Sequence, residues 1–326
     1  MVGKYHVEIS SRRNKYIFDV KRKYTFILGD SGTGKTKLGV LLKRSKQAGG
    51  SRIQINCSVP VVLVDSVEMM EKFYEDEINT KAIYVIDEDV IDGLVSKDKG
   101  KSFSENTEHM SAYFVLLTRN KLGALPYSPL EIYEFASRNV GTCCIREAVN
   151  VYYWEDSLPI SAEIAIVEDS KVGYYFFRDT LNCNVESAYG NGNLQNKLNN
   201  KIAEGYKSIV VIGDGAAIGC SIRKLMDIVK VNVGVKVHLF FPESFEYLVL
   251  KANLFSKDVN RELTKTYNYA ETTKFFSWER YYTNLLNSVS GSRGGYDKDD
   301  DELPKYLRSE VCINKIYDVI GEISRC

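Results

Sequence analysis

The stretch YTFILGDSGTGKTKLGVLLK at residues 24–43 decides the fold of the first half of this 326-residue chain. It predicts an apolar strand at 24–28, a loop of the form G-x-x-x-x-G-K-T at 29–36 and then a helix. Glycines let backbone N–H groups curl around phosphate oxygens without Cβ clashes, and the helix N-terminus adds a positive partial charge. The stretch therefore predicts a phosphate-binding loop between a strand and a helix.

Every residue of this loop, which has the Walker A pattern, is a candidate ligand of a nucleotide. Lys35 can reach the β- and γ-phosphates and is a candidate catalytic residue, and the hydroxyl of Thr36 can coordinate Mg²⁺. We expect ATP and Mg²⁺ as the bound groups. The nucleotide-binding candidates in the loop are Gly29, Asp30, Ser31, Gly32, Thr33, Gly34, Lys35 and Thr36.

A second apolar run, AIYVI at residues 82–86, ends in two acids and resembles a Walker B strand. In that reading Asp87 holds Mg²⁺ indirectly and the catalytic Glu88 polarises the attacking water. The alternative is a buried strand that leaves the core through two solvated carboxylates.

A third strand is expected at residues 112–117, and polar residues follow it. Thr118 or Asn120 could sense the γ-phosphate and Arg119 could contact it, because the ends of parallel strands beside such a loop face the nucleotide. The alternative is an ordinary strand exit. A further strand is expected at 61–65.

Together these segments resemble a compact P-loop NTPase of the additional-strand form over residues 20–140. The resemblance implies a Mg²⁺-dependent ATPase, which is a hydrolase. The sequence has no LSGGQ signature and no unambiguous arginine finger; Arg138 and Arg146 are candidates only by their position after the core.

The second half alternates strand and helix over residues 162–250, which predicts a mostly parallel sheet with helices on its faces. Three of its strands are followed by acids, namely Glu168, Asp214 and Glu243, and converging carboxylates suit Mg²⁺. The alternative is a set of solvated strand ends. The polar stretch at 291–302 is expected to be a solvated loop.

This half resembles a Toprim domain, the catalytic module of topoisomerases, primases and overcoming-lysogenization-defect (OLD) nucleases. Glu168 matches the glutamate that ends the first strand of that family, and Asp214 matches the first aspartate of its Asp-x-Asp pair. Ala216 stands at the second position of the pair, where Glu243 or Asp169 could substitute. A P-loop domain followed by a Toprim-like domain resembles a reduced OLD-type protein, which implies a nuclease that acts on DNA or RNA, and a role in anti-phage defence.

The predicted fold class is therefore α/β with two domains, a P-loop NTPase domain at 1–150 and a Toprim-like domain with a C-terminal helical extension at 151–326. One hypothesis is an ATPase whose cycle controls a metal-dependent domain acting on nucleic acid. A second is an ATP-gated switch or signalling protein whose Toprim-like domain is inactive, which Ala216 favours. A third is a small-molecule kinase, which Lys35 could serve.

Composition narrows these classes. The 43 basic and 43 acidic residues give zero net charge, which removes the simplest electrostatic argument for nucleic-acid binding. Three scattered histidines argue against a His-rich zinc site or a Ser-His-Asp triad.

Seven cysteines without a CxxC pair indicate reduced thiols. Without a signal peptide or a long apolar run, we expect a cytoplasmic protein with no membrane partner, and a homo-oligomer because such ATPases often complete their sites across an interface.

Overall fold

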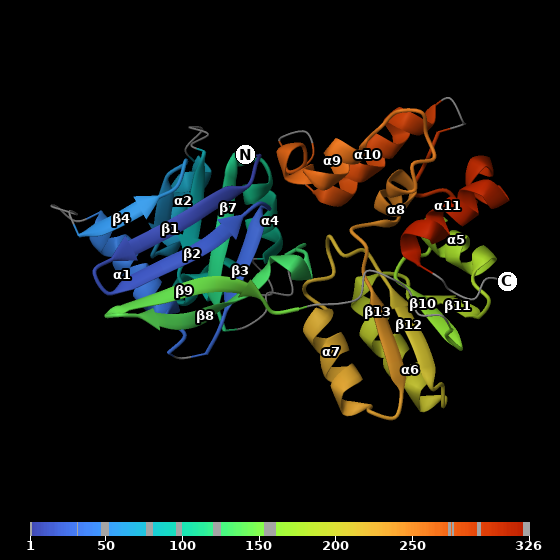
Figure 1. The fold of residues 1–326 in the computed structure, drawn as a ribbon, viewed down its shortest axis with the longest axis horizontal. Coiled ribbons are helices and arrows are strands. Elements are labelled where there is room, and N and C mark those ends of the chain that lie inside the picture. Colours follow the sequence, from blue (N-terminus) through green and yellow to red (C-terminus); the bar gives the residue numbers. More distant parts are fainter. Residues whose placement is uncertain are drawn as a thin grey trace. The chain divides into compact units, whose positions relative to one another are not determined.

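The computed structural model forms two compact units (Figure 1). The first contains Met1–Tyr153 and Tyr267–Phe276, and the second contains Trp154–Thr266 and Ser277–Cys326. Both units combine helices with a sheet, so the prediction of an α/β chain is confirmed. The sequence does not predict the return of Tyr267–Phe276 to the first unit. The structure describes residues 2–30, 32–46, 52–75, 81–95, 100–119, 125–152, 161–272, 275, 277–291 and 295–321.

The first unit is built on a mixed sheet with the order β4-β1-β2-β9-β8-β3-β7-β6-β5. Strands β8, β3, β7, β6 and β5 are parallel, whereas β4, β1 and β2 pair antiparallel and so do β8 and β9. The strands of this sheet are β1 Tyr5–Ser11, β2 Asn14–Val20, β3 Tyr24–Leu28, β4 Ile53–Asn56, β5 Val61–Val64, β6 Ala82–Ile86, β7 Ala112–Thr118, β8 Ile132–Val140 and β9 Cys143–Asn150.

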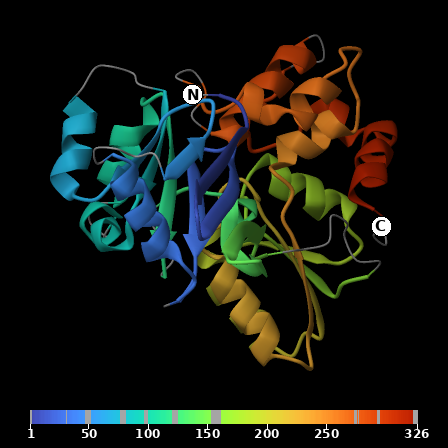
Figure 2. The ribbon, with the colours of Figure 1, turned by 60° about the vertical axis from the view of Figure 1, so that its left-hand side comes forward.

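Three of the parallel strands, β3, β6 and β7, form the core of this unit because both of their faces are covered. Every residue of β3, β6 and β7 is buried, as expected for strands with helices on both sides. Helix α1 packs beside β4 and β5, and α3 packs on β7 (Figure 2). The helices are α1 Lys35–Ser45, α2 Val67–Glu75, α3 Glu88–Val95 and α4 Gly100–Glu108, with a 3-10 turn at Pro129–Glu131.

The second unit has a parallel sheet with the order β11-β10-β12-β13. Its strands are β10 Ile164–Val167, β11 Asn184–Ser187, β12 Ser208–Ile212 and β13 Lys236–Phe240. Its helices are α5 Val172–Thr180, α6 Leu194–Ala203, α7 Ile222–Val231, α8 Phe245–Lys251, α9 Asn260–Thr264, α10 Trp278–Ser290 and α11 Glu310–Ile320, with 3-10 turns at Asn191–Asn193, Thr266–Asn268 and Lys305–Arg308. Since Val167 pairs with Ile212, the residues that follow β10 and β12 meet at one edge of the sheet. None of the helices in the described part of the chain is long and apolar enough to cross a membrane.

Glu271 belongs to the segment that returns to the first unit, and its side chain is only 6% exposed there. Burial raises the pKa of Glu271 to about 8, and the nearby charge of Glu131 acts in the same direction. The charges of Arg22 and Lys23 act to lower this pKa but do not outweigh burial. The folded chain therefore keeps a proton on Glu271 that the unfolded chain has released.

We expect the replacement Glu271→Gln to stabilise the first unit at neutral pH and to reduce its pH dependence. Between the ordinary pKa of 4.5 and about 8, the folded state binds the extra proton, so wild-type stability falls as the pH rises through this window. The amide removes that cost, which is about 3 kcal/mol near pH 7. Urea unfolding at pH 5 and pH 8 measures the effect, with the exposed Glu147→Gln as the control. A stability difference between Glu271→Gln and wild type that is the same at both pH values would contradict the prediction.

Candidate functional site

The glycine-rich loop joins the buried strand β3 to helix α1. Gly34 has a φ of 101°, in the left-handed region that favours glycine, and it forms the N-cap of α1. Among the described residues no side chain caps this helix, so its first backbone amides lack a side-chain acceptor. The local fold therefore presents amide donors and the positive end of a helix to an anion.

A cavity of about 540 Å³ lies over this loop and receives residues from α1, α3, β9 and the end of β7. Its lining residues are Asp30, Gly32, Gly34, Lys35, Thr36, Lys37, Val40, Arg44, Glu88, Arg119 and Arg146.

Most of the predicted nucleotide ligands thus share one cavity, but some do not line it. Gly29, Thr33 and the buried Thr118 are not among its lining residues. Ser31 and Asn120 lie outside the described residues.

Lys35 is held inside the loop, with only 4% of the residue exposed. Its Nζ donates to the carbonyl oxygen of Gly29 and so closes the loop on itself. Burial lowers the pKa of Lys35, while the charge of Glu88 partly opposes this. The ammonium group lies in the cavity wall, where a phosphate oxygen could replace the Gly29 carbonyl as its acceptor.

The two acids after β6 have different surroundings. The Oδ1 of Asp87 accepts the N–H of Glu88 at 2.7 Å, and a Cβ added at Gly39 would lie 2.9 Å from Oδ2. Asp87 therefore lies against α1, one turn after Thr36, and does not line the cavity itself. Burial raises the pKa of Asp87.

Glu88 lines the cavity and forms an ion pair with Arg119, whose Nε lies 3.0 Å from Oε1. Arg119 thus contacts the acid that is expected to polarise water, a pairing that the strand-end pattern did not predict. The ion pair orients the Glu88 carboxylate toward the carboxyl end of β7.

Sequence reasoning missed part of this cavity. Lys37, Val40 and Arg44 line it from the exposed face of α1, and their i, i+3, i+7 spacing is the signal that could have shown them. Of the two arginine candidates, Arg146 lines the cavity, whereas Arg138 is exposed on β8 and does not.

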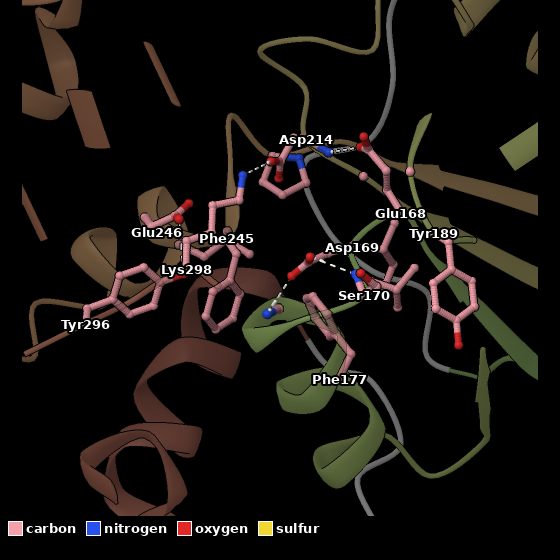
Figure 3. A pocket seen from close by; sticks show the side chains of 17 residues that line it. Glu168, Asp169, Ser170, Phe177, Tyr189, Asp214, Phe245, Glu246, Tyr296 and Lys298 are labelled. Carbon is pink, nitrogen blue, oxygen red and sulfur yellow. Dashed lines mark hydrogen bonds and ion pairs between the residues drawn. The ribbon is translucent and has the colours of Figure 1, made fainter. Parts of the chain in front are cut away.

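The second unit has its own cavity of about 270 Å³ at the carboxyl edge of its sheet (Figure 3). Four carboxylates line it, from Glu168, Asp169, Asp214 and Glu246, and so does Lys298. The strand ends therefore bring Glu168 and Asp214 together, because β10 and β12 are neighbours. Glu168 Oε2 accepts the backbone N–H of Asp214 at 2.9 Å.

Burial governs the protonation of these two acids. It raises the pKa of Glu168, and it raises that of Asp214 well above its ordinary value, with the charge of Lys298 acting in the opposite direction in both cases. Both carboxyl groups therefore lie where burial favours the protonated form, and a nearby cation is needed for both to be ionised at once.

The other two acids already serve the fold. Asp169 accepts three backbone amides at the start of α5, with distances of 2.7, 3.1 and 2.8 Å from the amides of Ser170, Lys171 and Gly173. The buried Glu246 accepts the hydroxyls of Tyr296 and Thr283 through Oε1. Oxygens of the Asp169 and Glu246 carboxylates are therefore held by hydrogen bonds within the protein, although both side chains also line the cavity.

Lys298 supplies a cation to this cavity from the polar stretch that was expected to be solvated. Its Nζ lies 3.8 Å from Asp214 Oδ2 (Figure 3). The same Nζ forms a closer ion pair with Glu279. Burial alone would lower the pKa of Lys298, but the surrounding carboxylates outweigh it and raise the pKa. The ammonium group thus takes the place at Asp214 that a metal cation was expected to occupy.

The remaining predicted acid, Glu243, does not line the cavity. Its backbone carbonyl accepts the N–H of Ala216 at 3.1 Å, which joins the segments after β12 and β13. At Gly215 a Cβ would lie 2.4 Å from the carbonyl oxygen of Phe241. The absence of a side chain at Gly215 therefore permits the close approach of these two segments.

Magnesium fits the two cavities differently. In the first unit the loop amides could donate to phosphate oxygens, and the Thr36 hydroxyl and nearby Asp87 offer oxygen ligands to Mg²⁺ bound with those phosphates. In neither unit does the described part of the chain contain three His, Cys, Asp or Glu residues arranged to hold a metal ion by themselves, and the acids of the second cavity would have no phosphate to complete the ligand set.

The chain matches no family model, no curated protein and no solved structure. The two cavities are therefore the features that bear on its function.

Proposed function

We propose that the first unit binds and hydrolyses ATP together with Mg²⁺. The observation that carries this proposal is the cavity of about 540 Å³ in which the glycine-rich loop, Lys35, Thr36 and Glu88 meet. Its volume is in the range of small-molecule sites. The strand order adds support, because β7 lies between β3 and β6 as the additional strand of the expected form.

Each residue of this cavity has a role in the proposal. The amides at the start of α1 and the ammonium of Lys35 would bind the phosphates. Glu88, oriented by Arg119, would accept a hydrogen bond from the attacking water. Thr36 and Asp87 would hold Mg²⁺, which supplies positive charge to the phosphate oxygens.

For the second unit we infer a nucleotide-gated binding or signalling role without a catalytic metal. Lys298 favours this role, because its ammonium group places a positive charge inside the acidic cavity, 3.8 Å from Asp214 Oδ2. Ala216 favours it too, because it leaves the second acid of the Toprim-like pair absent.

A second candidate function is metal-dependent cleavage of DNA or RNA, controlled by the ATPase. The observation in its favour is that Glu168 and Asp214 share one cavity, as the resemblance to Toprim domains implies. In this candidate Lys298 would have to move away from Asp214. Assembly into a homo-oligomer and a cytoplasmic location are further parts of the proposal.

One experiment distinguishes the two roles of the second unit. The wild type and Asp214→Ala are incubated with ATP, Mg²⁺ or Mn²⁺ and supercoiled, linear and single-stranded DNA, or with RNA; Asp227→Ala, exposed on α7, is the control. We expect ATP turnover without strand cleavage in all three proteins. Cleavage by the wild type and by Asp227→Ala that is lost in Asp214→Ala would establish the nuclease instead.

A further inference from the structure

Arg146 reaches the glycine-rich loop from outside the P-loop core. It lies on β9, whose partner β2 places Tyr16 opposite it in the parallel register. Its Nη1 donates to Asn14 Oδ1 at 3.0 Å, and its guanidinium carbon lies 5.3 Å from the centre of the Tyr16 ring. The Tyr16 hydroxyl in turn donates to the carbonyl of Gly34 at 2.9 Å. The neighbouring strands β2 and β9 thus hold one arginine against the loop.

The contact between Arg146 and Gly34 is close. A Cβ added at Gly34 would lie 2.4 Å from Nε and 2.8 Å from Cδ of Arg146. The Nε atom is buried and has no hydrogen-bond partner among the described residues. A buried donor without an acceptor is unfavourable, and this one belongs to a residue that lines the cavity.

The other cations at the inner end of the cavity already have partners. Lys35 donates to the Gly29 carbonyl, and Arg119 pairs with Glu88. Within the described residues Arg146 forms no ion pair with a carboxylate; its Nη1 donates to Asn14 and its guanidinium lies over the Tyr16 ring. An anion in the cavity would complete its coordination.

We propose that Arg146 binds the phosphate groups of the nucleotide and so supplies, within the same chain, a guanidinium at the amino end of α1. The planar guanidinium offers several N–H donors in a fixed geometry that suits phosphate oxygens. Gly34 at this position leaves space for the arginine because it has no Cβ. The inference rests on the proposed ATP binding and adds the residue that recognises the polyphosphate.

The test uses inorganic tripolyphosphate and ATP as separate probes, titrated calorimetrically into wild type, Arg146→Ala and Arg146→Lys. Arg138→Ala is the matched control, because Arg138 lies exposed on the adjacent strand β8. We expect Arg146→Ala to weaken the binding of both probes by about 10- to 100-fold, the effect of one charge-assisted hydrogen bond or slightly more. Arg146→Lys should be intermediate and Arg138→Ala should resemble wild type.

Thermal unfolding of each variant shows whether the fold is intact, and Arg146→Lys decides the matter if Arg146→Ala does not fold. Unchanged tripolyphosphate binding in folded Arg146→Ala overturns the role of Arg146 but leaves the proposed ATP site standing. If the alanine variant is unfolded, unchanged binding in Arg146→Lys has the same meaning. If the wild type binds neither probe, the proposed ATP site fails together with this inference.

Discussion

Replacement of Lys35 by alanine is expected to lower the rate of ATP hydrolysis by about 10²–10³-fold, the loss typical when one donor to the transition state is removed. Lys35 is the buried cation of the loop and lines the cavity that is proposed to hold the phosphates. Its charge would be most valuable in the transition state, when negative charge spreads over the transferred phosphoryl oxygens. Steady-state phosphate release with saturating ATP and Mg²⁺ measures the effect.

Lys43→Ala is the matched control for this variant. Lys43 lies on the same helix, its side chain is exposed and pairs with Asp65, and it does not line the cavity. A surface pair of this kind contributes little to stability, so the control should hydrolyse ATP at the wild-type rate. Equal rates in wild type and Lys35→Ala would show that hydrolysis, if present, occurs elsewhere.

Replacement of Lys298 by alanine is expected to tighten Mn²⁺ binding to the acidic cavity by at least about 10-fold. The variant removes a positive charge 3.8 Å from Asp214 Oδ2, which leaves the carboxylates of the cavity without their internal cation. Mn²⁺ accepts the same hard oxygen ligands as Mg²⁺ and can be followed by electron paramagnetic resonance.

The titration is done without nucleotide in an Asp87→Ala background, which removes a proposed metal ligand of the first unit so that this unit contributes little to metal binding. Lys171→Ala is the control, because Lys171 pairs with the exposed Asp301 and does not line the cavity. Unchanged Mn²⁺ affinity in Lys298→Ala would contradict the internal-cation account. Tight Mn²⁺ binding by a chain that retains Lys298 would instead favour the metal-dependent candidate.

The central parallel strands of both units could be predicted from the sequence because they are buried on both faces. The apolar runs at 24–28 and 82–86 coincide with β3 and β6, whose residues are all buried. The same logic predicted that Glu168, Asp214 and Glu243 converge at one sheet edge, and the structure places the first two in one cavity whereas Glu243 does not line it. Local apolar pattern and strand-end position are sufficient for this part of the site.

The rest of the site depends on contacts between distant segments, which no local pattern encodes. Arg146 reaches the loop only because β9 pairs with β2, more than a hundred positions earlier in the chain. Lys298 lies in a stretch whose composition is that of a solvated loop, yet it faces the acids of the sheet edge. Glu271 similarly becomes buried only because its segment returns to the first unit.

We propose above all that the glycine-rich loop of the first unit binds ATP with Mg²⁺. Calorimetric titration of ATP and Mg²⁺ into the wild-type chain tests it most directly, with Lys35→Ala titrated in parallel. The account predicts saturable binding of one nucleotide per chain that is strongly weakened in the variant. Absence of binding to the folded wild type, or equal affinity in the two proteins, would contradict it.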